Sequence, residues 1–490
     1  MMSLAQAARA LAADGLACRI AGAEAAEFAK VSIDTRTLEP GALYVALRGP
    51  RFDGHEFAQE ARARGAVALL VERPVPVDLP QLVAADTRRG LGLIAACWRA
   101  QFSFPVISVT GSNGKTTTTQ MIASVLAQAY GEHDGRRCWF ATKGNRNNEI
   151  GVPLMLLELR REHRAAVLEL GMNHPGEIGL LSQWVRPTVA LVTNAQREHQ
   201  EFLDSVEATA RENGFAIAAL PADGTAVFAA DDACAAVWRD LAGTRRVLDF
   251  ALHGAATVGA DFRLGTRSCQ LRIRAPGATI ATELALSGEH NVRNALAASA
   301  ACLAVGIGAG DIAAGLAAFR PVGGRGTWLA GRGGATLIDE SYNANPDSVR
   351  AAIDLLAQCE GYRVLVFGDM GEVGSRAEEF HREIGRYAHE RGIDRLLALG
   401  PQAQAAVDAF GAGASHFDTV EELIGAALEL TRGGAAPTGA TASPGPVLAA
   451  GITILAKGSR FMRLERVVRA LEQDPPSDAR RAQGVPQDHA

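Results

Sequence analysis

Lysine is scarce in this sequence of 490 residues: only four of its 49 basic residues are lysines, at positions 30, 115, 143 and 457. Arginine replaces lysine readily where a positive charge alone is needed, so a retained lysine points to a site that uses its compact ammonium group. We therefore treat Lys115, Lys143 and Lys457 as candidate functional residues.

Long apolar runs and a basic surplus are also absent. No apolar stretch approaches the ~20 residues of a membrane-spanning helix, and no cationic segment precedes an apolar one at the N-terminus, so we expect neither membrane insertion nor a signal peptide. The net charge of −5 gives no support to nucleic-acid binding. Seven cysteines without close pairs predict a reducing compartment, the cytoplasm, and no disulfide or zinc framework.

The composition that remains is that of a large globular protein. Hydrophobic residues make up 48% of the chain, and at roughly 150 residues per domain its length predicts about three domains. Alternating strands and helices indicate an α/β fold with parallel sheets, and residues 249–286 alternate as in an antiparallel meander. We place the domains at residues 1–101, 102–325 and 326–472, with a flexible loop at 433–446 and a disordered tail at 473–490.

The strongest local motif is a glycine-rich loop between a strand and a helix. The apolar residues 105–109 are followed by TGSNGKTT at 110–117 and by a helix expected to reach about residue 129. Glycines let backbone N–H groups approach phosphate oxygens, Lys115 would neutralise phosphate charge, and the Thr116 hydroxyl would bind Mg²⁺. Val109 stands where the full Walker pattern has glycine, yet a nucleotide site is favoured over a plain glycine turn.

Polar residues lie in or just after two further apolar strands. Glu169 lies in the apolar stretch 165–170, where a carboxylate needs a metal or an ion-pair partner. Beside a phosphate loop we favour a Mg²⁺ ligand over an ion pair with arginine. The stretch 189–193 is followed by Asn194, with His199 five residues further on, and α/β sheets bind ligands at this edge.

These motifs resemble those of the Mur ligases, the ATP-dependent amide-bond ligases of peptidoglycan precursor synthesis. The shared features are the loop at 110–117, Glu169, Asn194 with His199, HNxxN at 290–294, Arg325 and KGSR at 457–460. A second set resembles the Mur ligases that add D-alanyl-D-alanine to UDP-N-acetylmuramoyl-tripeptide: SIDTR at 32–36, GPRFDGHEF at 49–57, GNRNNEIGVP at 144–153, ELGMNHPGEI at 169–178, DESYNANPDS at 339–348 and GDMGEVG at 368–374.

The resemblance implies an N-terminal UDP-sugar-binding α/β domain, a central P-loop domain with a parallel sheet that binds the mononucleotide, and a C-terminal Rossmann-like domain. It also implies a reaction: ATP phosphorylates the terminal carboxylate of UDP-N-acetylmuramoyl-tripeptide to an acyl phosphate, which the amine of D-alanyl-D-alanine attacks. The implied cofactors are ATP and Mg²⁺, and the implied state is a monomer. Either diaminopimelate or lysine fits as the third peptide residue.

Carried over residue by residue, the resemblance assigns the site as follows. The catalytic residues are Lys115, Glu169, His199 and Arg325, and the metal ligands are Thr116, Glu169 and His199. The ATP contacts are Gly111, Ser112, Asn113, Gly114, Lys115, Thr116, Thr117, His290, Asn291, Asn294, Arg325, Asp339 and Tyr342. The substrate contacts are Ser32, Asp34, Thr35, Arg36, Asp53, Gly54, His55, Asn145, Asn147, Asn148, Asn343, Asn345 and Ser348.

Some of these residues also have plainer interpretations. His290 and Asn291 would serve as a helix cap, residues 343–346 as an ordinary turn, and Lys457 with Arg460 as a solvated cationic loop. In most Mur ligases a lysine 14 residues after the histidine is carbamylated and holds a second Mg²⁺. Here that position is Asn213, so we predict no carbamylated lysine; Glu212 or a rearranged His199 would have to compensate.

Other functions compete with this one. Another Mur ligase or a folylpolyglutamate synthase would use the same ATP chemistry, although the motifs at 144–153 and 342–346 argue against both. A P-loop ATPase switch would hydrolyse ATP without an amine acceptor. A non-catalytic nucleotide-binding scaffold would leave Glu169 without a purpose.

Overall fold

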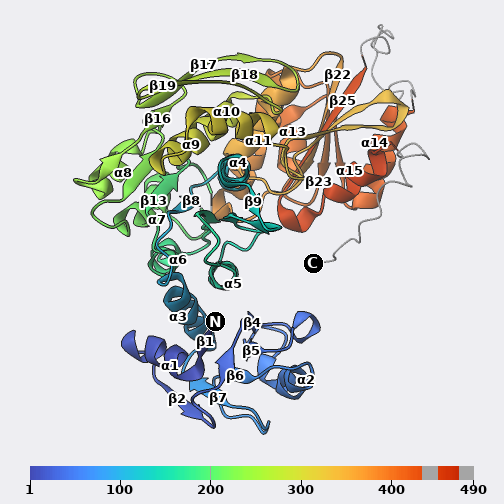
Figure 1. The fold of residues 1–490 in the computed structure, drawn as a ribbon. Helices are drawn as coiled ribbons and strands as arrows, with labels where there is room; N and C mark the ends of the chain where they lie inside the picture. Colours follow the sequence, from blue (N-terminus) through green and yellow to red (C-terminus); the bar gives the residue numbers. More distant parts are fainter. Residues whose placement is uncertain (199, 433–450, 474–490) are drawn as a thin grey trace.

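The computed structural model describes residues 1–198, 200–432 and 451–473, which form three α/β domains as predicted. Figure 1 shows the N-terminal domain in blue, joined through one helix to the green central domain, with the orange and red C-terminal domain beside the latter. The predictions for His199, for the loop at 433–446 and for the tail beyond residue 473 lie outside the described residues. Within those residues, no helix is long and apolar enough to span a membrane.

The N-terminal domain is built on a sheet of order β2-β7-β6-β5-β4, parallel except for the β2–β7 pair. Strands β5 and β6 are buried along their whole length, as expected for a sheet covered on both faces. Its elements are β1 (Met2–Ser3), α1 (Leu4–Ala13), β2 (Cys18–Ala21), β3 (Glu27–Phe28), β4 (Lys30–Ser32), β5 (Ala42–Val45), α2 (Ala58–Ala63), β6 (Ala68–Val71), β7 (Gln81–Ala84) and α3 (Thr87–Arg99).

The central domain contains a wholly parallel sheet of order β11-β12-β8-β13-β14-β15. Strand β8 lies between β12 and β13, so the loop that follows it sits where the strand order reverses, the usual ligand position in such sheets. The elements are β8 (Val106–Thr110), α4 (Lys115–Tyr130), β9 (Glu132–His133), β10 (Arg136–Arg137), β11 (Trp139–Ala141), α5 (Gly151–Leu157), β12 (Ala165–Glu169), α6 (Glu177–Val185), β13 (Val189–Val192), α7 (Val206–Ala218), β14 (Thr225–Phe228), α8 (Ala235–Ala242) and β15 (Arg246–Val247).

A second, four-stranded sheet covers the helices of the central domain. The predicted antiparallel meander is confirmed for β17, β18 and β19, whereas β16 pairs with β17 in parallel. The elements are β16 (Phe250–Ala251), β17 (Val258–Leu264), β18 (Cys269–Ala275), β19 (Ala278–Leu284), α9 (Glu289–Ala304) and α10 (Ala309–Ala318).

The C-terminal domain repeats the central design with a sheet of order β20-β21-β25-β22-β23-β24, parallel except for the β20–β21 pair. The strand that ends at Lys457, β25, lies between β21 and β22, again at a reversal of strand order. The elements are β20 (Thr327–Ala330), β21 (Thr336–Asp339), α11 (Pro346–Ala357), β22 (Tyr362–Gly368), α12 (Ala377–Glu390), β23 (Arg395–Leu399), α13 (Gln404–Phe410), β24 (Ala414–Phe417), α14 (Val420–Thr431), β25 (Ile452–Lys457) and α15 (Glu465–Leu471).

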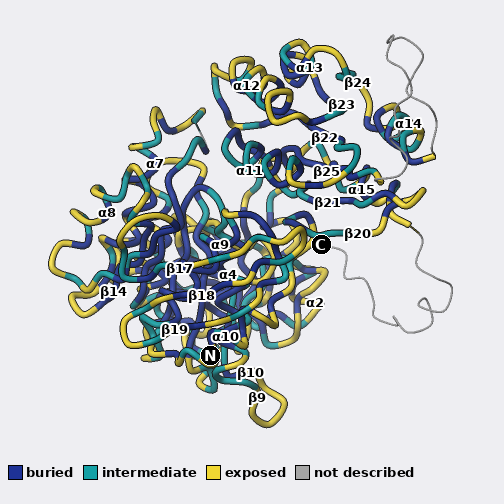
Figure 2. Tube along the Cα trace, turned by 90° about the horizontal axis from the view of Figure 1, so that it is seen from above, coloured by how far each residue is buried: buried dark blue, intermediate teal, exposed yellow. Residues whose placement is uncertain are grey.

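The domains are joined in two different ways. One buried apolar cluster runs from the N-terminal domain through α3 into the central domain and includes Leu91 and Trp184. The described apolar clusters of the C-terminal domain lie on the two faces of its own sheet and contain no residue of the central domain. Figure 2 shows exposed residues on the outer surfaces, such as α8 and the β9–β10 hairpin. The contact between the central and C-terminal domains is therefore mainly polar.

Candidate active site

Two sheet edges face each other across a cavity of about 760 Å³. Loops after β8, β12 and β13 form one side, and loops after β21, β22 and β25 form the other. The predicted site residues that line it are Ser112, Asn113, Gly114, Lys115, Thr116, Thr117, Asn145, Asn147, Asn148, Glu169, His290, Asn291, Asn294, Arg325, Tyr342, Asn343, Asn345 and Ser348.

The phosphate loop has a backbone that only glycine permits at two positions. Gly111 has φ +124°, and a Cβ there would lie 2.2 Å from the Thr193 hydroxyl oxygen. Gly114 has φ +81°, and a Cβ there would lie 2.2 Å from Asn294 Oδ1. The loop leads directly into α4, whose N-terminus begins at Lys115, so its free N–H groups are available to phosphate.

Two asparagines hold this loop from the neighbouring strand and helix. Asn194 accepts from the Asn113 N–H at 2.9 Å and donates to the Asn113 carbonyl at 3.0 Å. Asn213 Oδ1 accepts from the Thr110 hydroxyl at 2.6 Å and from the Gly111 N–H at 2.9 Å. Asn213, which is fully buried, therefore braces the loop from behind.

Glu212 is engaged away from the cavity. Its two carboxylate oxygens accept from the N–H groups of Gly176 at 2.9 Å and Ile178 at 3.0 Å. These donors lie at the start of α6, where backbone N–H groups lack helical partners. The carboxylate caps that helix in this structure, and Glu212 does not line the cavity.

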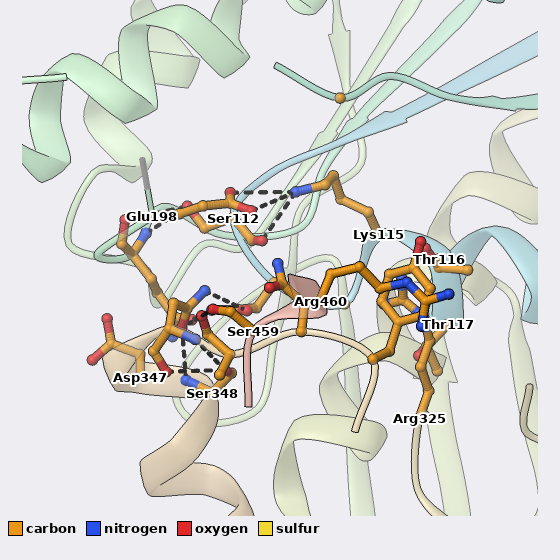
Figure 3. Close-up of a pocket in the computed structure, with 18 of the residues that line it drawn as sticks. Ser112, Lys115, Thr116, Thr117, Glu198, Arg325, Asp347, Ser348, Ser459 and Arg460 are labelled. Atoms are coloured by element: carbon orange, nitrogen blue, oxygen red, sulfur yellow. Dashed lines mark hydrogen bonds and ion pairs between the residues drawn. The ribbon is translucent and has the colours of Figure 1, made fainter. Parts of the chain in front are cut away.

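Lys115 is folded back onto its own loop. Its Nζ donates to the carbonyls of Gly111 at 2.6 Å and Ser112 at 3.0 Å, and it pairs with Glu198 Oε1 at 3.0 Å. Figure 3 shows the lysine extending towards Ser112 and Glu198 and away from Thr116. Sequence reasoning missed Glu198; its only signal was its place beside His199 in the loop after β13.

Glu169 is 2% exposed at the carboxyl end of β12. Its Oε1 accepts from Asn147 Nδ2 at 2.8 Å, and no basic side chain of the described chain forms an ion pair with it. A buried carboxylate with an amide as its neighbour is short of positive charge, which a cation would supply. Thr116 lines the same cavity, so the pair fits a Mg²⁺ ion.

That ion would also need oxygen ligands from a nucleotide. Among the described residues no group of three His, Cys, Asp or Glu side chains is placed to hold a metal. Phosphate oxygens commonly complete such a Mg²⁺ site.

His290 and Asn291 do not cap helix α9. The N-cap is Gly288, without a side-chain hydrogen bond, so the capping interpretation is wrong. Asn291 Nδ2 instead donates to the Ser287 carbonyl at 2.8 Å. Burial lowers the pKa of His290, which leaves a neutral imidazole at the cavity wall near pH 7.

Two guanidinium groups lie against Tyr342 on the opposite wall. The Cζ atom of Arg325 is 4.0 Å from the ring centroid and that of Arg460 is 5.3 Å from it. Both distances fall within the range of cation–π contacts. The segment between α10 and β20, which we call the linker, and the C-terminal domain therefore each bring one cation to the cavity.

Lys457 is not part of a solvated loop. It is the last residue of β25 and 4% exposed, and its Nζ donates to the Asn343 carbonyl at 3.0 Å and to Glu340 Oε2 at 3.4 Å. Burial lowers its pKa. The solvated interpretation of Lys457 is wrong because the strand carries its ammonium group into the wall, where it holds the loop after β21.

Asn345 and Asp339 act as local braces. Asn345 caps α11 in a reciprocal capping box with Ser348, and its Nδ2 also donates to Asn113 Oδ1 at 2.9 Å. Residues 343–346 do not form the ordinary turn of the plainer interpretation: the turn lies at residues 341 and 342, and residue 346 already belongs to α11. Asp339 does not line the cavity; its Oδ2 accepts from the Gly324 N–H at 2.9 Å.

The predicted sugar-binding residues lie in the N-terminal domain and do not line the cavity: Ser32, Asp34, Thr35, Arg36, Asp53, Gly54 and His55. Asp53 accepts from Arg73 Nη2 at 2.8 Å, and this partner holds the pKa of its carboxyl well below the usual range. His55 is buried, and its Nε2 accepts from the Glu72 N–H at 2.8 Å. Both side chains therefore tie their loop to the segment that follows β6.

Known sequence families match most of the chain. Residues 27–94 match the Mur ligase family catalytic domain, residues 109–302 the Mur ligase middle domain, and residues 324–436 the Mur ligase glutamate ligase domain. The UDP-N-acetylmuramoyl-tripeptide–D-alanyl-D-alanine ligase of Escherichia coli is 40% identical over 91% of this chain and 94% of its own length. The enzyme of that name from Bacillus subtilis is 34% identical over the same shares.

Solved structures agree in fold. MurF from Acinetobacter baumannii superposes with a TM-score of 0.85 and 33% identity, covering 95% of this chain and 98% of its own. MurF from Thermotoga maritima in complex with ADP gives a TM-score of 0.75 at 25% identity, covering 90% of this chain and 96% of its own. The folylpolyglutamate synthase of Mycobacterium tuberculosis, at 17% identity and a TM-score of 0.63, shares the fold.

Proposed function

The chain belongs to the Mur ligase family, and from its site we infer that it joins D-alanyl-D-alanine to UDP-N-acetylmuramoyl-tripeptide at the expense of ATP. The products are the pentapeptide precursor of peptidoglycan, ADP and phosphate. The enzyme is an ATP-dependent ligase, as are the relatives to which it is similar over nearly the whole chain.

One observation carries this proposal: cations from two domains converge on one cavity. Lys115 lies at its central-domain side, Arg325 in the linker, and Lys457 with Arg460 on the C-terminal side. Transfer of the γ-phosphoryl group to a carboxylate brings two anions together, and their repulsion must be offset by positive charge. A cavity with this charge distribution suits that step.

We propose the following roles for the chain's own residues. The N–H groups of the loop and the start of α4 bind the phosphates, and Lys115 leaves Glu198 to neutralise the transferred group. Arg325 holds the acyl-phosphate oxygens, while Tyr342 and Asn294 bound the nucleotide pocket. Asn345 and Ser348 orient the incoming dipeptide amine. The seven N-terminal residues from Ser32 to His55 bind the UDP-sugar.

Mg²⁺ is the proposed metal cofactor, held by Glu169 and Thr116, and it would neutralise charge on the phosphates when bound. Asn147 would orient the Glu169 carboxylate through its hydrogen bond of 2.8 Å. His199 remains a proposed metal and catalytic residue on the resemblance alone. The uncharged Asn213 supports a site without a carbamylated lysine.

We further propose a cytoplasmic monomer. Use of ATP and seven free cysteines fit a reducing compartment that contains nucleotides. Light scattering coupled to size exclusion would test the monomer, with a mass of 51.4 kDa expected.

Phosphate release tests the function. The enzyme is supplied with ATP, Mg²⁺, UDP-N-acetylmuramoyl-tripeptide and D-alanyl-D-alanine, and each is left out in turn. We expect release only with both co-substrates, together with a pentapeptide product seen by mass spectrometry. Lys115→Met should lower kcat by about 100-fold or more, the usual cost of losing one charge-stabilising group. Release from ATP alone, unchanged by either co-substrate, would instead indicate an ATPase switch.

A further inference from the structure

A cluster of charged side chains joins the central and C-terminal domains at the edge of the cavity, where Asp347 is a lining residue. Arg197, in the loop after β13, donates from Nη2 to Asp347 Oδ1 at 2.6 Å and from Nη1 to Glu383 Oε2 at 2.7 Å. Its backbone N–H donates to Asp347 Oδ2 at 2.9 Å. The three side chains are 20–23% exposed, so these charge-assisted bonds are largely shielded from solvent.

The neighbours of Arg197 face the opposite way. Gln196 Oε1 accepts from Asn113 Nδ2 at 2.6 Å, and Glu198 Oε1 accepts from Lys115 Nζ at 3.0 Å. Three consecutive residues thus alternate between the phosphate loop and the C-terminal domain. Residues 196–198 therefore contact the phosphate loop and the C-terminal domain at the same time.

Asp347 connects the cluster to the cavity. It lies in the first turn of α11, two residues after Asn345, whose amide exchanges hydrogen bonds of 2.9 and 3.3 Å with the amide of Asn113. Holding Asp347 therefore holds the start of α11 against the phosphate loop. No described apolar cluster spans this interface, so polar contacts must set the position of the domain.

We propose that Arg197 is a positioning residue of the ligase, which docks the C-terminal domain so that the cations of both domains face one cavity. The proposal rests on the proposed function. Arg197 does not line the cavity and acts through Asp347 and Glu383. Without its guanidinium, the central domain would lose its ion pairs with these two carboxylates of the C-terminal domain, and the loss of that attraction would favour separated domains.

Kinetics and solution scattering test the proposal in the full chain. Arg197→Met should lower kcat/KM for D-alanyl-D-alanine by about 10- to 100-fold. Loss of a shielded ion pair would reduce the fraction of molecules in which the C-terminal domain is docked and the site is complete. Its radius of gyration with ADP should exceed that of the wild type. Arg197→Lys should fall between the two, because an ammonium keeps the charge and loses the two-pronged donation. The affinity of the variant for the UDP-sugar should stay within about twofold of the wild-type value. The proposed sugar site lies in the N-terminal domain and does not depend on docking of the C-terminal domain.

Arg382→Met is the matched control. Arg382 precedes Glu383 on α12 but pairs with Glu378 on the same helix and is half exposed. We expect wild-type kinetics and radius for it. A double-mutant cycle with Glu383→Gln adds a second check. Arg197→Met should cost less on that background, because one of the two ion pairs that it removes is already absent.

Two outcomes would overturn the role of Arg197. One is an Arg197→Met enzyme with wild-type kcat/KM and radius. The other is lost activity with an unchanged radius and additive effects in the cycle. If the wild type itself made no pentapeptide, the proposed function would fail, and the scattering comparison alone would still decide whether Arg197 docks the domain. Melting curves of each variant identify any that fail to fold.

Discussion

At the scale of single residues, the lysine of the phosphate loop forms an ion pair with a carboxylate. The Lys115 ammonium has Glu198 as its anionic partner, and phosphate must displace this carboxylate to take its place. The side chains of Lys115 and Glu198 are only 16% and 9% exposed, so their ion pair is stronger than one at the surface. We expect a bound nucleotide to separate the two side chains.

Neutralising Glu198 should therefore tighten nucleotide binding. We predict that Glu198→Gln lowers the Kd of ADP by about fivefold, equivalent to about 1 kcal/mol of ion-pair competition removed. Isothermal titration calorimetry with ADP measures this, with Glu207→Gln as control, since Glu207 is exposed and pairs with Arg211 on α7. Weaker binding by the variant would show that Glu198 supports the loop more than it competes with phosphate.

The residues predicted from sequence and those found differ for a physical reason. Loop glycines and Glu169 were predictable because their types are costly anywhere else: positive φ requires glycine, and a carboxylate in an apolar strand requires a partner. Asn213 and Glu198 carry no such cost, so their roles depend on what folding brings beside them. Lys457 was predicted as a candidate functional residue, but its burial could not be predicted, because its strand is defined by partners far away in the chain.

At the scale of elements, α3 joins two domains by close packing. Gly92 faces α6, where a Cβ would lie 2.2 Å from the Trp184 ring. Gly92→Ala should lower stability by about 1–3 kcal/mol, the usual cost of overpacking a core. Gly310→Ala in α10 is the control, because no atom lies within 4 Å of its Cβ; there we expect a gain of about 0.5–1 kcal/mol. Calorimetric melting compares the two, and an unaffected Gly92→Ala would mean that α3 and α6 are not tightly packed.

A buried histidine makes the C-terminal domain sensitive to acid. His381 on α12 accepts from the Met370 N–H through Nε2 at 2.9 Å and contacts the Ala377 carbonyl through Nδ1 at 2.6 Å. Burial lowers its pKa, although Asp369, 4.0 Å away, opposes this. The folded state then binds fewer protons than the unfolded state, so stability rises with pH.

The stabilisation should be complete above about pH 6.5 and lost as pH falls towards the lowered pKa. His381→Gln should flatten this slope, because glutamine keeps an acceptor for Met370 and does not titrate. Urea unfolding between pH 5 and 8 measures it, with exposed His133→Gln as control. His163 and His290, whose pKa values are also lowered by partial burial, would keep their share of the slope. An unchanged slope in His381→Gln would assign the acid sensitivity to them.

At the scale of the whole molecule, the two interfaces predict which domain moves. The N-terminal domain shares an apolar cluster with the central domain through α3, whereas the C-terminal domain meets the central one through polar contacts. Large apolar interfaces hold domains together, and small polar ones permit motion. The fold class was predictable from strand and helix alternation, but this difference was not, since it depends on side chains that meet only after folding.

Nucleotide binding should therefore change hydrogen–deuterium exchange at the interface between the central and C-terminal domains and leave it unchanged between the N-terminal and central domains. We predict that ADP with Mg²⁺ slows exchange in residues 343–348 and 194–198, because closure orders both sides of the polar interface. Peptides from α3 and α6 should be slow to exchange with or without nucleotide, since their contact is part of a continuous core. Faster exchange there in the free enzyme would mean that the N-terminal domain is the mobile unit. In that case the N-terminal domain would rotate and carry its sugar-binding loops to the cavity. If exchange there stays slow, the bound substrate must span the distance between these loops and the cavity.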